Sequence, residues 1–451
     1  MIHTFPKDFI WGAACSSVQM EGSIYEDGRT LSGKEAAFFS PNPKIRFRDD
    51  RSPVTGIDYY HKFPEDHKLF RELGIGMFRF SFSWSRIIPT ADGTPNRKGI
   101  DHYNAVIDDM LSNGITPFFD LWHCDIPDWV IQNGGMADDR FIGWFTHYAE
   151  VCFRAFGDRV KYWSTINESK LNVYGAYSHA HDAPFLRDED LAMKATQNAI
   201  LAHYEIVRLL HEIWPDAKIG SIHNAGACYP ATFSEADQAA AVRHSAMQLL
   251  LLDPMMKGEY PPEVVNDPSR RKYFTPERAA ELRERFVPQD FYGINYYCPM
   301  IVAHGEGSAY ETHTVETDLP RDAYGFTTYA PGLYDLLLDL NERYDGAPVL
   351  ITENGYTYRR EDVYRMNLED YQHDSLRVSY IRDHLRECSR AIRAGVNLKG
   401  YFYWSVMDCW ELSMGFGYPM GLIGVNLDTL ERIPRDSFRF YQQVIENNAV
   451  I

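Results

Sequence analysis

The sequence has few cysteines, no long apolar run and no excess of basic residues. Its seven cysteines are scattered among 451 residues without a Cys-x-x-Cys pair, which is typical of reduced thiols rather than a disulfide framework. No stretch reaches the roughly 18 consecutive apolar residues that a membrane-spanning helix needs. The first residues, MIHTFPKDFIWGAAC, also lack the basic and apolar regions of a signal peptide. We therefore expect a cytoplasmic protein without a membrane partner.

The charge balance argues against nucleic acid as a partner. Asp and Glu number 63 and Lys and Arg 45, which gives a net charge of −18. Binding to nucleic acid or to an anionic membrane needs a basic surface, so neither is expected here. The sequence gives no indication of oligomeric state.

Apolar and aromatic residues are abundant. Apolar residues make up 45% of the chain and aromatic residues 14%, with 29 Tyr and 9 Trp, which is enough for a large packed core. Tyr and Trp also stack on sugar rings, but composition alone favours the core interpretation.

No linker or charge block divides the chain, so we expect one domain over residues 1–451. A short apolar run, a turn and a helix-period segment recur along it. Expected helices include 101–113, 141–156, 191–214 and 375–394. The expected strands are 9–13, 77–81, 116–120, 162–166, 218–222, 291–295, 349–352 and 398–404.

Eight strands that alternate with helices indicate a parallel α/β fold. A doubly wound sheet fits this alternation as well as a barrel does, although the G-x-G-x-x-G turn of a dinucleotide-binding sheet is missing. The ends of the strands distinguish the two, because polar residues follow nearly every strand and a barrel brings such residues to one face. We therefore predict a single (β/α)₈ TIM barrel with elaborated βα loops.

Two glutamates directly follow apolar strands, in TINE (Glu168) and ITE (Glu353). A single charge at a strand end is more often exposed or part of a structural ion pair. Together, on strands four and seven of a barrel, the two carboxylates lie on opposite sides of its mouth. This is the placement that glycoside hydrolysis requires.

From Phe5 almost to the C-terminus, the chain resembles glycoside hydrolase family 1. The resemblance rests on FPKDFIWGAA, Gln19 with Glu21-Gly22, EDGR, FRFSFSWSRIIP, GGM, TINES, GINYY, ITENG and YFYWSVMD. It implies a retaining β-glycosidase, similar to β-glucosidases, that acts on a small-molecule or oligosaccharide β-glycoside without a metal or organic cofactor.

The resemblance also implies a role for individual residues. Glu353 is the expected nucleophile and Glu168 the expected acid/base, with their carboxyls about 5–5.5 Å apart for retention. Arg79 and Tyr297 are expected to keep Glu353 ionised, and the charge of Glu353 to raise the proton affinity of Glu168. The residues expected to contact the sugar are Gln19, His123, Asn167, Asn295, Tyr297, Trp404 and Glu411.

Several family positions differ in this chain. Cys124 and Leu412 stand where the family has tryptophans that approach the sugar near its O3 hydroxyl. The family's SIW is Ser32-Gly33-Lys34, its GGW ends in Met136, and residues 414–426 are also unlike their counterparts. Compensating drift explains the changes at Cys124 and Leu412 as well as a glycone other than plain glucose, or one substituted on that side, does. The remaining changes leave the chemistry intact and bear on the preference for the aglycone.

Other functions compete with this interpretation. A 6-phospho-β-glycosidase is disfavoured because Glu411 would repel phosphate, and a non-catalytic sugar-binding relative because both glutamates are present. A metal hydrolase is disfavoured because His123, Cys124 and Asp125 would point in alternating directions on an extended segment. His179 and His181 are expected at the surface or behind the site. Transfer to an acceptor alcohol, through the same intermediate, stays open.

Overall fold

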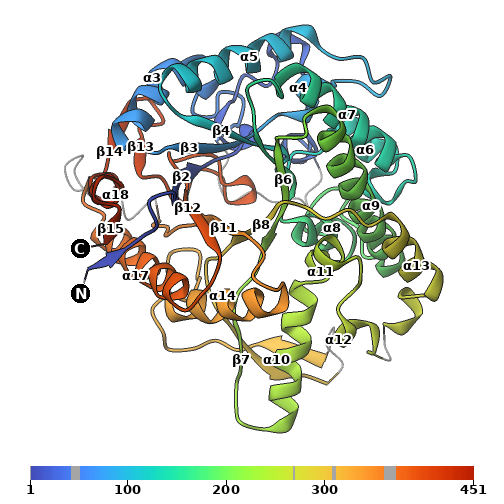
Figure 1. Cartoon of the computed structure of the whole chain (residues 1–451). Helices are drawn as coiled ribbons and strands as arrows, with labels where there is room; N and C mark the ends of the chain where they lie inside the picture. Colours follow the sequence, from blue (N-terminus) through green and yellow to red (C-terminus); the bar gives the residue numbers. More distant parts are fainter. Residues whose placement is uncertain (1, 42–50, 268–269, 307–310, 360–371, 451) are drawn as a thin grey trace.

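The computed structural model describes residues 2–41, 51–267, 270–306, 311–359 and 372–450. Eight parallel strands form a closed barrel in the order β11-β12-β2-β3-β4-β5-β6-β8, and Figure 1 shows helices packed around it. The predicted TIM-barrel fold is therefore confirmed, and the doubly wound alternative is wrong because the sheet closes on itself.

The barrel strands fall close to the predicted ranges. They are β2 (Ile10–Ala14), β3 (Met77–Ser81), β4 (Thr116–Trp122), β5 (Tyr162–Asn167), β6 (Lys218–Asn224), β8 (Phe291–Asn295), β11 (Val349–Asn354) and β12 (Leu398–Trp404). β4, β5, β6 and β11 extend one or two residues beyond the prediction. Their last residues are polar or aromatic, but they still pair with neighbouring strands at the barrel mouth.

The principal outer helices are amphipathic segments packed on these strands. α7 (Phe141–Phe156) buries Phe141, Phe145, Tyr148 and Cys152 along one face, at the spacing of a helix turn. α5 (Arg97–Ser112) and α9 (Glu189–Ile213) begin earlier than predicted, and Asp188 caps α9 through the N–H of Leu191. The others are α3 (Tyr59–Leu73), α8 (Ser169–Tyr177), α14 (Pro331–Arg343), α17 (Ser375–Arg393) and α18 (Asp436–Asn447).

Shorter elements build the loops between strands and helices. β7 (Cys228–Pro230), β9 (Met300–His304) and β10 (Thr312–Thr314) form a small sheet beside α10 (Glu235–Gln248), and β13 (Ile423–Val425) pairs with β14 (Arg432–Pro434). Short helices are α1 (Ser17–Met20), α2 (Gly33–Phe38), α4 (Trp84–Ile87), α6 (Asp128–Gln132), α11 (Leu252–Lys257), α12 (Pro262–Val265) and α13 (Pro276–Arg285). The 3₁₀ turns are η1 (Glu26–Gly28), η2 (Gly135–Ala137), η3 (Arg271–Tyr273) and η5 (Leu412–Met414).

The two ends of the described chain lie side by side. β1 (His3–Thr4) pairs with β15 (Ala449–Val450), as Figure 1 shows at the labelled termini. Within the described ranges, no helix is long and apolar enough to cross a membrane.

Side chains fill the barrel interior. A buried cluster that includes Met77, Phe118, Phe291 and Phe402 occupies it, while a larger core lies between the strands and the helices. The barrel is therefore no open channel, and ligands have access to it at the carboxyl ends of the strands.

Candidate active site

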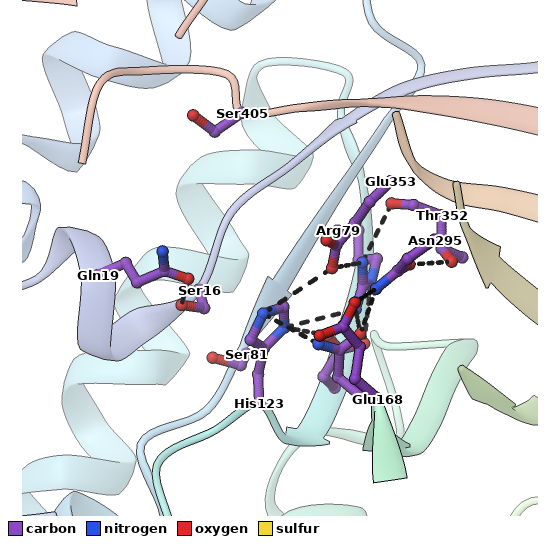
Figure 2. Close-up of polar contacts among 12 residues, drawn as sticks. Ser16, Gln19, Arg79, Ser81, His123, Glu168, Asn295, Thr352, Glu353 and Ser405 are labelled. Carbon is purple, nitrogen blue, oxygen red and sulfur yellow. Dashed lines mark hydrogen bonds and ion pairs between the residues drawn. The ribbon is translucent and has the colours of Figure 1, made fainter. Parts of the chain in front are cut away.

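The carboxyl ends of the strands bring six of the predicted polar side chains together. Figure 2 shows Arg79 from β3, His123 beyond β4, Glu168 beyond β5, Asn295 from β8 and Glu353 from β11 pointing toward one another. Asn167, the last residue of β5, bonds into the same group.

Arg79 lies at the centre of this group. Its Nη1 donates to Glu353 Oε1 over 2.8 Å, its Nη2 to Asn167 Oδ1 over 2.7 Å, and its Nε and Nη2 to Asp120 over 3.1 and 2.7 Å. The Arg79 side chain is fully buried. Burial opposes its charge, but Asp120 and Glu353 outweigh burial and raise the pKa of Arg79, so it stays a permanent cation.

Glu353 is held on both carboxylate oxygens. Arg79 contacts Oε1, and the Tyr297 hydroxyl donates to Oε2 over 2.7 Å. Burial raises the pKa of Glu353, whereas Arg79, His123 and the Tyr297 hydrogen bond lower it in part. The expected effect of Arg79 and Tyr297 is thus present, but burial exceeds it and the net direction is upward.

Glu168 lies in the turn between β5 and α8, with a left-handed φ of 49°. Asn295 Nδ2 donates to its Oε1 over 3.0 Å, and Asn172 of α8 donates to its backbone oxygen over 3.2 Å. Burial is the largest cause of the raised pKa of Glu168, so the expected effect of the neighbouring Glu353 charge is secondary. A raised pKa keeps a carboxyl protonated and able to donate a proton.

His123 lies between polar neighbours and the ring of Trp404. Its Nδ1 bonds Asp120 Oδ2 over 2.9 Å, and Asn167 Nδ2 lies 3.2 Å from its Nε2. Its ring stacks on Trp404, with centroids 5.2 Å apart and an interplanar angle of 10°. The Asp120 carboxylate requires a proton on Nδ1, which fixes the orientation of the ring.

Gln19 and Glu411 form a second polar group. Gln19 Nε2 donates to Glu411 Oε2 over 3.1 Å, and the Ser16 hydroxyl donates to Gln19 Oε1 over 2.7 Å. Burial, followed by the charge of Glu353, raises the pKa of Glu411 to about 8, and a hydrogen bond from Tyr324 opposes the shift. In Figure 2, Gln19 stands apart from the Arg79 group.

Sequence reasoning missed Asp120, Asn224 and Tyr324. Asp120 holds both Arg79 and His123, Asn224 bonds Glu168, and Tyr324 bonds Glu411. Asp120 carried a signal, since an aspartate in the middle of an apolar run needs a buried partner. Tyr324 carried none, because it lies in a loop.

The segment after β4 corrects one prediction. We expected His123, Cys124 and Asp125 to be extended, but β4 ends at Trp122 and Cys124 has a left-handed φ of 64°. The alternating-direction argument against a metal site is therefore wrong. Within the described ranges, no three His, Cys, Asp or Glu side chains are grouped to hold a metal ion. His179 and His181 are exposed, and Leu412 packs against the core.

Comparison with known proteins places the chain in one family. The glycosyl hydrolase family 1 model matches residues 1–450. Beta-glucosidase A of Thermotoga maritima is 35% identical over 100% of this chain and 99% of its own. A 6-phospho-beta-glucosidase of Bacillus subtilis is 34% identical over 100% of each. The T. maritima beta-glucosidase in complex with glucoimidazole superposes with a TM-score of 0.92 at 34% identity, covering 99% of both chains. The chain belongs to glycosyl hydrolase family 1.

Proposed function

We propose that Glu353 is the nucleophile and Glu168 the acid/base of this retaining β-glycosidase. One observation carries the assignment: of these two glutamates, Glu353 contacts a permanent cation, Arg79, whereas Glu168 accepts from the neutral amide of Asn295. The cation favours a carboxylate, and a neutral burial site favours a carboxylic acid. The expected separation of about 5–5.5 Å between the carboxyls stays a prediction.

The other polar groups are assigned to the glycone. Asn167 and Asn295 hold the 2-hydroxyl beside the anomeric carbon, with Arg79 and Tyr297 orienting Glu353. Trp404 forms the floor on which the sugar ring lies. The hydroxyls farther from the anomeric carbon are held by Gln19, His123 and Glu411, which offer donors and acceptors side by side.

The reaction is a double displacement. Glu353 attacks the anomeric carbon while Glu168 gives its proton to the leaving oxygen, so the glycosidic bond breaks and a glycosyl ester forms. Glu168, now a carboxylate, removes a proton from water, whose oxygen displaces Glu353 from the anomeric carbon. The products are the free sugar in its β configuration and the alcohol. An acceptor alcohol in place of water would give transfer by the same steps.

A 6-phospho-β-glycosidase is the second candidate, and one relative carries that name. The argument that Glu411 repels phosphate is weaker than expected, because a pKa of about 8 leaves Glu411 largely protonated at neutral pH. The groups bonded to Glu411, Gln19 and Tyr324, are nevertheless neutral. A phosphate needs cationic partners, so the unphosphorylated glycone is favoured.

The glycone pocket is modified at Cys124 and Leu412, so we propose a glycone that is not plain glucose or that carries a substituent. The test is a panel of nitrophenyl β-glycosides: glucoside, galactoside, fucoside, xyloside, glucuronide, a disaccharide glycoside and the 6-phosphoglucoside. If the plain glucoside outranks all others, both positions are drift.

A cytoplasmic location also stays a prediction, consistent with seven unpaired cysteines.

The variants Glu353→Ala and Glu168→Ala test the two roles. Loss of acid catalysis costs about 10²–10⁴-fold, so Glu168→Ala should be slow on nitrophenyl glycosides and much less so on dinitrophenyl glycosides, whose leaving group needs no proton. Added azide should rescue Glu168→Ala with a β-glycosyl azide, and Glu353→Ala with the α-anomer. Undiminished turnover in Glu353→Ala would remove the assignment. An α-glycosyl azide from Glu168→Ala and a β-glycosyl azide from Glu353→Ala would reverse it. If neither the wild type nor the variants turn over a substrate, the protein is a non-catalytic sugar-binding relative of the family.

A further inference from the structure

A cavity of about 300 Å³ lies beside the glycone-binding groups and takes no part in the mechanism above. Cys124, which directly follows His123, and Ser413, two residues after Glu411, both line it. It therefore borders the two segments that hold the hydroxyls farthest from the anomeric carbon. Asn172, which bonds the backbone of Glu168, lies on another wall.

Four of the positions at which the chain differs from its family meet at this cavity, whereas Leu412 and residues 414–426 do not line it. Gly33, Lys34, Cys124 and Met136 come from three separate segments of the sequence, and all four line it. At Gly33 the space has been refilled, because a Cβ there would lie 2.2 Å from Ile131 Cδ1. Elsewhere the space stays open, so neighbouring side chains have not compensated for all of these changes.

The cavity wall is mostly apolar and carries one ion pair. Trp122, Ile126, Ile131, Met136 and Phe185 supply apolar surface. Lys34 Nζ pairs with the carboxylate of Asp182, and both side chains are only partly exposed. The wall thus combines a strong donor and a strong acceptor with surfaces on which a ring can pack.

We infer that this cavity binds a second, neutral sugar unit that is linked to a distal hydroxyl of the glycone, so that the enzyme releases a disaccharide. The inference rests on the proposed function, since it uses the assigned position of the glycone. The aglycone–glycone bond breaks at the same anomeric carbon, water supplies the new hydroxyl, and the bond between the two sugars stays intact.

The chemistry of the wall favours a sugar over other substituents. A sugar hydroxyl both donates and accepts, so it matches Lys34 and Asp182 together. An anionic group would meet Asp182, and the nearby Glu168 as well. A purely apolar group would cover the ion pair without forming a hydrogen bond to it, and removing the two charges from water costs free energy. At about 30 Å³ for each water molecule, the cavity holds about ten waters, which is room for one sugar unit.

The first experiment compares nitrophenyl β-glucoside with the nitrophenyl β-glycosides of three glucose disaccharides, linked through O3, O4 or O6. The initial products are separated by chromatography. We expect kcat/KM for at least one disaccharide glycoside to exceed that for the glucoside by about tenfold or more, with release of the intact disaccharide. The preferred linkage identifies the hydroxyl that faces the cavity. If the glucoside outranks all three, or the disaccharide is first cut to glucose, the inference is wrong.

Filling the cavity provides the second experiment. Cys124→Trp and Met136→Trp place an indole in it from two different segments, and each should lower the ratio of disaccharide-glycoside to glucoside kcat/KM by about tenfold or more. Phe233→Trp is the matched control, because Phe233 is 97% exposed and does not line this cavity. Thermal unfolding identifies any variant that fails to fold. Such a variant is set aside, and the comparison of substrates with the wild-type enzyme still tests the inference.

Two further outcomes separate this inference from the function on which it rests. If folded filling variants keep the wild-type ratio, or if they impair only substrates with a sugar leaving group, the cavity does not bind a glycone substituent. Hydrolysis of the plain glucoside, abolished in Glu353→Ala, would then leave the proposed function intact. Failure of all four substrates in the wild type would instead count against the proposed function.

Discussion

At the scale of single residues, the site is organised by charge pairs around Arg79. Asp120 contacts both Arg79 and His123 and therefore fixes the orientation of a cation and of a ring. Asp120 touches no reacting atom in the proposed mechanism, so it is a positioning residue. Its effect on catalysis is exerted through the charge of Arg79 and through the orientation of His123.

Replacing Asp120 with Asn keeps the shape but removes the negative charge. We expect kcat to fall about 10²-fold, since buried charge-assisted hydrogen bonds contribute about 1.5–3 kcal/mol each. Without Asp120, the Arg79 charge acts more fully on Glu353 and lowers its pKa. The acid limb of the pH profile of kcat/KM should therefore move to lower pH.

Ser164→Ala is the control, because Ser164 donates to Asp120 Oδ1 over 2.6 Å and not to Arg79 or His123. It should keep most of the activity and leave the acid limb in place. An Asp120→Asn enzyme with a lower kcat but an unmoved acid limb would show that Asp120 acts on structure alone.

The residues of the site were predicted where a strand carries them. Arg79, Asn295 and Glu353 lie at or near the ends of apolar runs, and that pattern together with the family resemblance singled out Glu168 and Glu353. The partners in loops, such as Tyr324, were not predictable, because loop conformation depends on tertiary contacts. The pKa directions were also missed in part, since burial is a property of the fold.

At the scale of elements, the contact between β11 and β12 sets the floor of the pocket. Gly355 follows β11, and a Cβ on it would lie 1.8 Å from the backbone oxygen of Trp404, the last residue of β12. No side chain fits there, because backbone atoms cannot rotate away. Gly355 therefore fixes the distance between β11, which carries Glu353, and Trp404.

Gly355→Ala should displace Trp404 relative to Glu353. We expect a loss of about 1–3 kcal/mol in stability, as for other overpacked sites, and a rise in KM for the glycone, measured by thermal unfolding and steady-state kinetics. Gly143→Ala is the control: this glycine lies in α7 with open space at its Cβ, so alanine should be neutral or slightly stabilising. Unchanged stability and KM in Gly355→Ala would refute the steric argument.

The elements themselves were largely predictable, and their ends less so. β3, β8, β12 and α7 match the predicted bounds, because apolar periodicity marks them clearly. β11 continues through Glu353 to Asn354, although polar residues usually end a strand prediction. The site is made of such residues, so the prediction fails at the functional end of the strand.

At the scale of the whole molecule, buried carboxyls link stability to pH. Burial raises the pKa of Asp125 to about 8, and the Asp125 Oδ2 atom has no hydrogen-bond partner among the described residues. The unfolded chain releases this proton near pH 4, whereas the folded protein holds it until about pH 8. The stabilisation is therefore complete below pH 4 and declines as the pH rises to about 8.

Asp125→Asn removes this titration and keeps the acceptor for the His123 N–H. At pH 8 the variant should be more stable than the wild type, by a few °C in Tm. Its stability should also change less than that of the wild type between pH 4 and 8. Asp318→Asn, at an exposed position, should follow the wild type throughout. A variant that loses stability equally at both pH values would contradict the linkage.

The architecture of the whole chain was predictable because the strand ends converge only in a barrel. The cavity beside Cys124 was not, since its walls come from segments far apart in the sequence. The changes at Gly33, Lys34, Cys124 and Met136 were visible one by one. Only the fold shows that they share one space.

The proposed mechanism requires Glu353 to form the covalent bond to the sugar. The most direct test is to incubate the enzyme with dinitrophenyl 2-deoxy-2-fluoro-β-glucoside, whose fluorine slows hydrolysis of the intermediate, and to map the labelled peptide by mass spectrometry. We predict one glycosyl adduct per chain, on Glu353, with inactivation and slow recovery. An adduct on another residue, or an active enzyme that forms no adduct and releases the α-sugar from unmodified substrate, would contradict it.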